Sequence, residues 1–208
     1  MQVLRRGALA MLVVGCAIVA AAGASFAVTG AASPVFAFAH PSTPAALVAP
    51  GRVFAAAAGD SDGTSVVVYG GQTPNSNNAF GDTWVNGADE TWKPKCGTAV
   101  AGATAPCGPG PRDGLGMADA HGGVILYGGF PGDLGNAPSG DTWRWNGATW
   151  TRVCTTATCG PGVRGLMAMA GNGKTAVMFG GIGGSGLTND TWVFDGTTWA
   201  QACGQPGS

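Results

Sequence analysis

A pattern of about 50 residues recurs three times along this chain and limits its possible folds more than any other feature of the sequence. Each copy opens with an arginine and continues through two apolar stretches, the second of which ends in two glycines. An Asp-Thr-Trp triplet and a further tryptophan follow. The copies span residues 51–110, 111–162 and 163–208. The repeated residues are Arg52, Gly70, Gly71, Asp82, Trp84 and Trp92; Arg112, Gly128, Gly129, Asp141, Trp143 and Trp150; and Arg164, Gly180, Gly181, Asp190, Trp192 and Trp199.

Each copy contains four segments with the composition of short β-strands. The first is small and apolar, at residues 53–58, 115–120 and 166–170. The second, at 65–71, 123–129 and 175–181, is a nearly unbroken apolar run, which predicts a strand buried on both faces. The third and fourth carry Trp and Thr and are joined by Asn86-Gly87, Asn146-Gly147 and Asp195-Gly196. These pairs favour positive φ at both central turn positions, as in a type I′ hairpin. Four antiparallel strands in each copy predict a propeller blade.

The apolar strand ending in Gly-Gly, the Asp-Thr-Trp triplet and the second tryptophan together resemble kelch repeats, the blades of galactose-oxidase-like β-propellers. The resemblance covers residues 51–203 and recurs in the same order three times. It departs from the family at the third-strand aromatic residue, often Tyr, which is here Trp84, Trp143 or Trp192. The resemblance implies an all-β fold of three four-stranded antiparallel kelch-type blades. Propellers usually close with four to eight blades, so we expect an incomplete ring or one completed by oligomerisation.

We expect the repeated residues to be structural. The glycines after the second strand allow a tight bend and a close approach of neighbouring blades. The tryptophans can fill the space between blades, because each buries a large apolar area. The arginine of each copy and the aspartate of its Asp-Thr-Trp triplet are expected to hydrogen-bond or to pair within the fold, and we assign neither a catalytic role.

The N-terminus has the layout of a secretory signal peptide. Arg5 and Arg6 precede an apolar run over residues 7–28, and cleavage is possible after Ala27 or Ala39. We interpret 1–39 as signal peptide and leader and 40–50 as a linker, which predicts a secreted or cell-surface protein. Two alternatives stay open: an uncleaved membrane anchor, since the run is long enough to span a bilayer, and a lipoprotein lipidated at Cys16.

The remaining cysteines fit export, because disulfides persist in oxidising compartments. Two local pairs are predicted, Cys96 with Cys107 and Cys154 with Cys159, each closing the connection between two copies of the repeat. Cys203 is left unpaired.

Charge and composition exclude several function classes. A formal net charge of −1 gives no electrostatic footprint for nucleic acid, so no nucleic-acid partner is predicted. The chain has only two histidines, and its tyrosines, Tyr69 and Tyr127, lie in structural strands, which argues against the copper centre of galactose oxidase. Glu90 is the only glutamate, so the nucleophile pair of a sialidase is not evident. We therefore predict no catalytic, cofactor-binding or metal-binding residues.

Strand alternation places the long connections together on one rim of the blades. The loops at 72–80, 130–139 and 182–188 and the linkers at 96–111 and 154–163 share this edge, which we call the loop rim. The short turns lie on the opposite edge, the turn rim. Long loops held on a rigid scaffold are common sites of function.

These observations predict an exported, non-catalytic binding or scaffold module that contacts a carbohydrate or a protein through its loop rim. The abrupt end after Cys203 suggests the N-terminal part of a longer propeller. The alternatives are a homodimer that completes the ring, part of a carbohydrate-active enzyme with catalytic residues outside this chain, and a nonfunctional remnant. A membrane partner is expected only if the leader is uncleaved or lipidated.

Overall fold

The computed structural model describes residues 49–60, 62–74, 78–97, 107–132 and 135–204, all within a compact unit spanning Ser42–Ser208. The predicted signal peptide, the lipidation site at Cys16 and most of the 40–50 linker lie outside the described residues. Within the described ranges the chain is almost entirely β-structure, and the single helix, α1 (Thr156–Cys159), is one turn long. None of the helical structure in these ranges is long and apolar enough to cross a bilayer.

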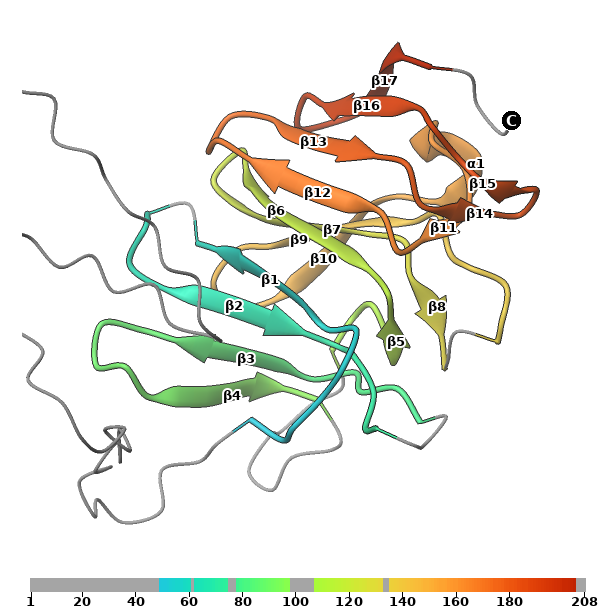
Figure 1. Ribbon diagram of the computed structural model, residues 1–208. Helices are drawn as coiled ribbons and strands as arrows, with labels where there is room; N and C mark the ends of the chain where they lie inside the picture. The colour runs from blue at the N-terminus through green and yellow to red at the C-terminus, as the bar shows by residue number, and fades with distance from the viewer. Residues whose placement is uncertain (1–48, 61, 75–77, 98–106, 133–134, 205–208) are drawn as a thin grey trace, which may run out of the picture. The chain divides into compact units, whose positions relative to one another are not determined.

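Three four-stranded antiparallel sheets, one for each copy of the repeat, confirm the predicted all-β class (Figure 1). Blade 1 contains β1 (Ala56–Gly59), β2 (Val66–Tyr69), β3 (Thr83–Asn86) and β4 (Trp92–Cys96). Blade 2 contains β6 (Gly116–Ala120), β7 (Gly123–Tyr127), β9 (Thr142–Trp145) and β10 (Trp150–Cys154). Blade 3 contains β12 (Ala168–Gly171), β13 (Ala176–Phe179), β16 (Thr191–Phe194) and β17 (Trp199–Cys203). Within the described residues the blades do not close into a ring.

Short strands outside the blades organise the loop rim, and the sequence pattern did not reveal them. In one ribbon β5 (Arg112–Asp113) pairs with β8 (Phe130–Pro131). In the other, β14 (Ile182–Gly183) pairs with both β11 (Arg164–Gly165) and β15 (Gly186–Leu187). The β14–β15 hairpin and α1 lie at the end of blade 3 opposite the β12–β13 turn (Figure 1). Parts of the loop rim are therefore held by backbone pairing.

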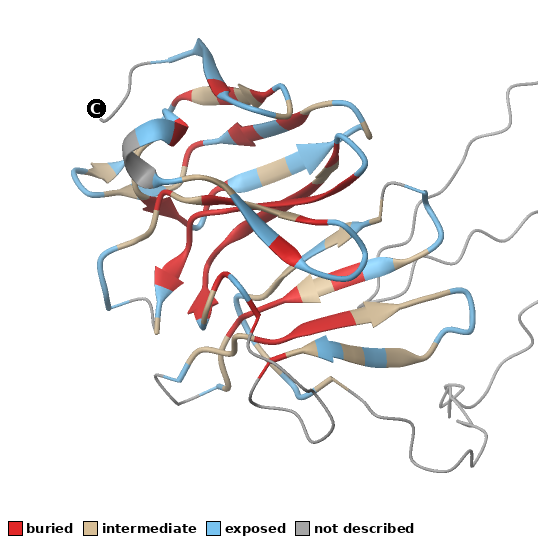
Figure 2. Ribbon diagram, turned by 180° about the vertical axis from the view of Figure 1, so that it is seen from behind, coloured by how far each residue is buried: buried red, intermediate tan, exposed pale blue. Residues whose placement is uncertain are grey.

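The prediction that every second strand is buried on both faces is correct only for blade 2. β7 is buried at all five residues, whereas β2 and β13 alternate between buried and more exposed residues. The reason is that blade 2 packs against a blade on each side, while blades 1 and 3 each contact one blade among the described residues. Figure 2 shows the same difference, with exposed residues on the outer sheets.

Two apolar clusters hold the three blades together. The first joins Val67 and Tyr69 of β2 to residues of blade 2 that include Val124 and Leu126. The second joins the other face of β7, at Ile125 and Tyr127, to blade 3. Strand alternation explains this division, since successive side chains of β7 point to opposite faces.

The predicted type I′ turns are wrong. Trp145 pairs with Trp150, so the turn of blade 2 contains the four residues 146–149. Gly147 has positive φ, but Asn146 does not. Instead, Asn146 Oδ1 accepts hydrogen bonds from the backbone N–H groups of Ala148 and Thr149, at 3.0 and 2.8 Å. Asp195 does the same in blade 3. The Asn or Asp side chain therefore closes the turn as an Asx motif.

The double glycines combine a left-handed backbone with a close approach between blades. Gly128 has a φ of 63°, and a Cβ added there would collide with the carbonyl oxygen of Arg164 in the following copy. Gly70 has the same conformation and the same relation to Arg112. A side chain at either position would push two blades apart.

We predict that Gly128→Ala lowers the free energy of unfolding more than Gly122→Ala does. Gly122 also has positive φ, at 75°, but nothing lies within 4 Å of an added Cβ, so it controls for backbone strain alone. The extra cost at Gly128 should be about 1–3 kcal/mol, the usual effect of overpacking. Urea denaturation measures both variants, and equal losses would contradict the close approach.

Candidate functional site

A buried ion pair stands at the loop-rim end of each blade. The guanidinium Nη1 atom contacts the aspartate Oδ1 atom at 2.6, 2.7 and 2.6 Å in the pairs Arg52–Asp82, Arg112–Asp141 and Arg164–Asp190, respectively. These are the repeated arginines and aspartates of the sequence pattern. The sequence predicted that these residues hydrogen-bond or pair within the fold without naming their partners, and the structure shows that they pair with one another.

The third-strand tryptophans complete these pairs. The indole Nε1 of Trp84, Trp143 or Trp192 donates a hydrogen bond to the aspartate two residues earlier, at 2.7, 2.6 and 2.6 Å. Each arginine also donates to the carbonyl of the first glycine of the Gly-Gly pair, Gly70, Gly128 or Gly180. We call each such set an Arg–Asp–Trp anchor. It joins the start of a blade to the points where its long loop leaves the second strand and enters the third.

Blade 2 shows how an anchor reaches the linker before it. Arg112 Nη2 donates to the carbonyl of Pro109, and Arg164 Nη2 donates likewise to Pro161. Ser139 adds a hydroxyl hydrogen bond to Asp141 Oδ1 at 2.5 Å. The anchor therefore fixes both kinds of connection that form the loop rim.

The anchors of blades 2 and 3 lower the pKa of their carboxyl groups. Burial alone would raise the pKa of Asp141, but the hydrogen bonds and positive charge of Arg112, with further hydrogen bonds from Ser139 and Trp143, bring this pKa below its ordinary value. The pKa of Asp190 is lowered in the same way, because Arg164 and Trp192 outweigh the effect of burial.

The fourth-strand tryptophans connect neighbouring blades. Trp150 Nε1 donates to Thr83 Oγ1 of blade 1 at 2.9 Å, and Trp199 Nε1 donates to Thr142 Oγ1 of blade 2 at 3.0 Å. Sequence reasoning placed tryptophans between blades but missed these threonine acceptors. The repeat itself pointed to these threonines, since Thr is the middle residue of all three Asp-Thr-Trp triplets.

Tyrosines add a second repeated contact between blades. Tyr69 Oη donates to Gly110 O at 2.9 Å, and its ring meets Trp150 edge-on, with centroids 5.3 Å apart. Tyr127 makes the same contacts with Gly162 O and Trp199, again with centroids 5.3 Å apart. Burial raises the pKa of both tyrosines, so their hydroxyls remain protonated donors.

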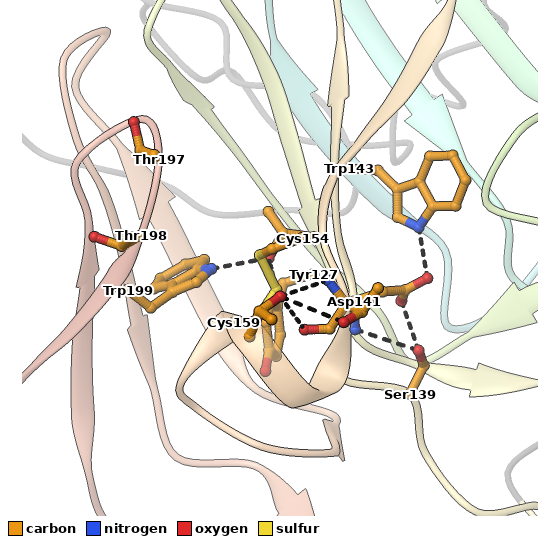
Figure 3. The surroundings of a disulfide bond; sticks show 12 residues. Tyr127, Ser139, Asp141, Trp143, Cys154, Cys159, Thr197, Thr198 and Trp199 are labelled. Carbon is orange, nitrogen blue, oxygen red and sulfur yellow. Dashed lines mark hydrogen bonds between the residues drawn. A yellow bond between two sulfur atoms is a disulfide. The ribbon is translucent and has the colours of Figure 1, made fainter.

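Both local cysteine pairs are disulfides, Cys96–Cys107 and Cys154–Cys159. Figure 3 shows the second with Trp199 on one side and Asp141 on the other. Thr142 Oγ1 lies 3.1 Å from Cys159 Sγ, so the disulfide sits beside the contact between blades 2 and 3. Two disulfides indicate an oxidising, extracellular-type environment.

Cys203 is free and exposed. It pairs with Thr191 across β16 and β17, as Cys96 pairs with Thr83 in blade 1 and Cys154 with Thr142 in blade 2. Its place in the blade is therefore that of the two disulfide-bonded cysteines.

The described part of the loop rim carries no charged side chain on its loops or linkers. Its exposed residues include Asn78, Asn136, Ala137, Ser185 and Leu187. The arginines beneath it are neutralised in the anchors. Its polar groups are therefore hydroxyls, amides and backbone groups.

The turn rim is different in character. Its described turns carry Asp60, Asp62, Asp89, Glu90, Lys174 and Asp195. Among the described loop and turn residues, charge is therefore found on the turn rim, which gives the rims different binding chemistry.

Blade 3 also has an open hollow of about 430 Å³ beside its Gly-Gly pair. Its lining is mainly apolar and consists of Leu166, Ala168, Phe179, Gly180, Gly181, Ile182, Leu187 and Thr188.

No three His, Cys, Asp or Glu side chains gather as a potential metal site within the described ranges. Comparison with known proteins adds no assignment, since no protein-family model and no curated protein matches this sequence. What is shown is therefore an architecture: blade-like β-propeller sheets, tied by buried anchors, whose loop rim carries no charge on its described loop and linker residues; Asp133, in the loop at 130–139, lies outside the described residues.

We predict that Arg112→Met lowers the free energy of unfolding by about 3–5 kcal/mol, the usual cost of removing one partner from a buried ion pair. Asp141 would be left partly buried without its guanidinium partner. Arg152→Met is the control, because Arg152 is exposed and lies over the Trp143 ring at 5.7 Å without a described ion pair. Chemical denaturation should show a loss of about 1 kcal/mol or less for the control; losses of equal size would contradict the role of the anchor.

Acid should weaken the anchor of blade 2. Because the pKa of Asp141 is lower in the folded chain, its ionisation stabilises the fold fully above the unfolded-state pKa of about 3.9, and this contribution disappears as the pH falls through the lower folded-state value. We predict that the stability difference between the wild type and Asp141→Asn is constant near neutral pH and shrinks below about pH 4. Thermal unfolding across this range tests it, and a difference unchanged down to pH 2 would contradict it.

Proposed function

We propose that this protein is an exported kelch-type β-propeller module that binds a neutral polar ligand, a glycan in the first instance, through its loop rim without catalysing a reaction. The observation that carries the proposal is the contrast between the two rims. The described loop rim offers hydroxyl, amide and backbone groups with no charge, whereas the turn rim is charged.

Rigidity supports a binding role for this rim. The linkers are closed by disulfides, the long loops of blades 2 and 3 contribute to short ribbons, and every anchor lies directly beneath. Preorganised groups lose less conformational entropy when a ligand binds. A neutral ligand fits, because the described loop residues offer no charged partner and a charged ligand would leave its own charge unpaired there.

The kelch assignment rests on the repeated Gly-Gly, Asp-Thr-Trp and second tryptophan, which the anchors and blade contacts explain physically. Export rests on the sequence of residues 1–39 together with the two disulfides. We propose the secreted or cell-surface location on these grounds.

Binding should depend on the loop rim and not on the turn rim. We expect the full chain to bind members of a glycan array, and Ala137→Lys to weaken that binding at least tenfold by adding charge and bulk to the loop rim. Ala148→Lys is the matched control: it is the same substitution in the same blade at an exposed residue of the turn rim. Titration calorimetry with the best array ligand measures both variants.

Equal affinities for the two variants would contradict the loop rim as the binding surface. Binding to a protein array with no glycan bound would replace the glycan with a protein partner. A folded chain that binds neither array would overturn the proposed function.

A further inference from the structure

Blade 3 leaves uncovered a sheet face that is covered in the other two blades. Phe179 is 55% exposed, whereas Tyr69 and Tyr127 at the same position of their repeats are fully buried. Val177 on the same face is also exposed. In blades 1 and 2 this face packs against the blade that follows.

Blade 1 leaves uncovered the opposite face. Val66 is 42% exposed, whereas Val124 and Ala176 at the same position are fully buried against the preceding blade. Val53 and Phe54 are exposed as well. The chain therefore exposes two different apolar faces. The face on blade 3 is the kind that packs against a following blade, and the face on blade 1 is the kind that packs against a preceding blade.

The contact between blades 1 and 2 includes three backbone hydrogen bonds close to the Gly-Gly pair of blade 1. Arg112 N donates to Phe80 O at 3.1 Å, and Gly71 N donates to Arg112 O at 2.9 Å. Gly114 N then donates to Phe54 O at 2.9 Å. The earlier blade thus presents an acceptor, a donor and an acceptor to the later one.

The contact between blades 2 and 3 repeats this set at the corresponding residues. Arg164 N donates to Ser139 O at 2.9 Å, Gly129 N to Arg164 O at 3.0 Å, and Leu166 N to Gly114 O at 2.7 Å. The two contacts between blades therefore use the same three backbone hydrogen bonds.

The backbone groups for a third contact of this kind are present on blades 3 and 1, and they form no hydrogen bond between described blades. Blade 3 presents the carbonyl of Thr188, the N–H of Gly181 and the carbonyl of Leu166, which match Ser139, Gly129 and Gly114 by position. Blade 1 presents the complement, the N–H and carbonyl of Arg52 and the N–H of Phe54.

The hollow on blade 3 lies where a following blade would insert. An added Cβ at Gly70 would lie 3.0 Å from Leu115 Cδ2 of blade 2, and one at Gly128 would lie 3.0 Å from Met167 Cε of blade 3. Beside Gly180 no such side chain is present, and the hollow remains. Blade 1 carries the smaller Ala55 at this repeat position, next to the exposed Phe54.

We propose that blade 3 of one copy binds blade 1 of a second copy, head to tail, with the contacts that join blades inside the chain. A head-to-tail contact either closes or propagates as a filament. Two copies with two such contacts give a ring of six blades, within the range in which propellers close. This inference does not rest on the proposed ligand, because it is argued from the contacts that join blades and is tested by the mass of the assembly, although Leu187 and Thr188 belong to the loop rim as well.

The mass of the full chain in solution tests the proposal. We expect light scattering coupled to size exclusion to give the mass of two copies, and Phe179→Asp or Val66→Asp to give one copy. Ala148→Asp, exposed on the turn rim, should leave the dimer intact. Leu187→Asp, at another exposed residue lining the hollow, gives a second test of the blade 3 face if Phe179→Asp does not fold.

Mixing the two single variants tests the head-to-tail arrangement. Phe179→Asp retains the blade 1 face and Val66→Asp retains the blade 3 face, so an equimolar mixture should form a one-to-one dimer although each variant alone is monomeric. Native mass spectrometry distinguishes the two chains by mass, and the circular dichroism spectrum of each single variant should match that of Ala148→Asp if the variant is folded.

Three results would overturn the proposal. A monomeric wild-type chain would mean that a second copy does not cover these faces. A Val66→Asp variant that remains dimeric while Phe179→Asp does not would indicate contact between two blade 3 faces. A mixture of folded variants that stays monomeric would exclude the complementary pairing.

Discussion

The buried Arg–Asp–Trp anchors are the interaction on which the blades and their loop rim depend. In blade 2, one guanidinium meets the linker at Pro109, the end of β7 at Gly128 and the carboxylate of Asp141 that precedes β9. Water does not replace these contacts, because the arginine is buried. A buried ion pair contributes little net energy beside a well-packed apolar alternative, but breaking it is costly. We infer that its value here is positional: it fixes where each loop leaves its sheet.

The contacts between neighbouring blades are also repeated, and they involve other side chains than the anchors do. A Thr of the earlier blade accepts a hydrogen bond from the indole of a Trp of the later blade. A Tyr of the earlier blade contacts the same Trp ring edge-on. The disulfide sulfur of the intervening linker lies beside that threonine. Anchor, linker and neighbouring blade are therefore coupled through a few buried polar groups, as expected when the stability of a repeat protein depends on contacts between adjacent units.

Repetition within the sequence was sufficient to predict the four-stranded blades, the local cysteine pairs and a structural role for the repeated Arg and Asp. It could not show which partner a repeated residue meets, because a position that recurs in every copy can bond within its own blade or across to the next. Thr83 and Thr142 were missed for that reason. The turn at Asn146 was predicted wrongly because the Asn-Gly pair suits more than one turn length, and a side-chain acceptor decided between them. The exposed faces of β2 and β13 depend on what lies beside each blade, which strand composition does not encode.

The threonine–tryptophan contacts also have a direction along the chain. Thr83 precedes its donor Trp150, and Thr142 precedes Trp199. A ribosome synthesises a chain from its N-terminus, so each acceptor has emerged before the indole that it will receive. The completed part of the molecule can thus serve as a template for the segment still being made, and blades can be added one after another without waiting for the last residue.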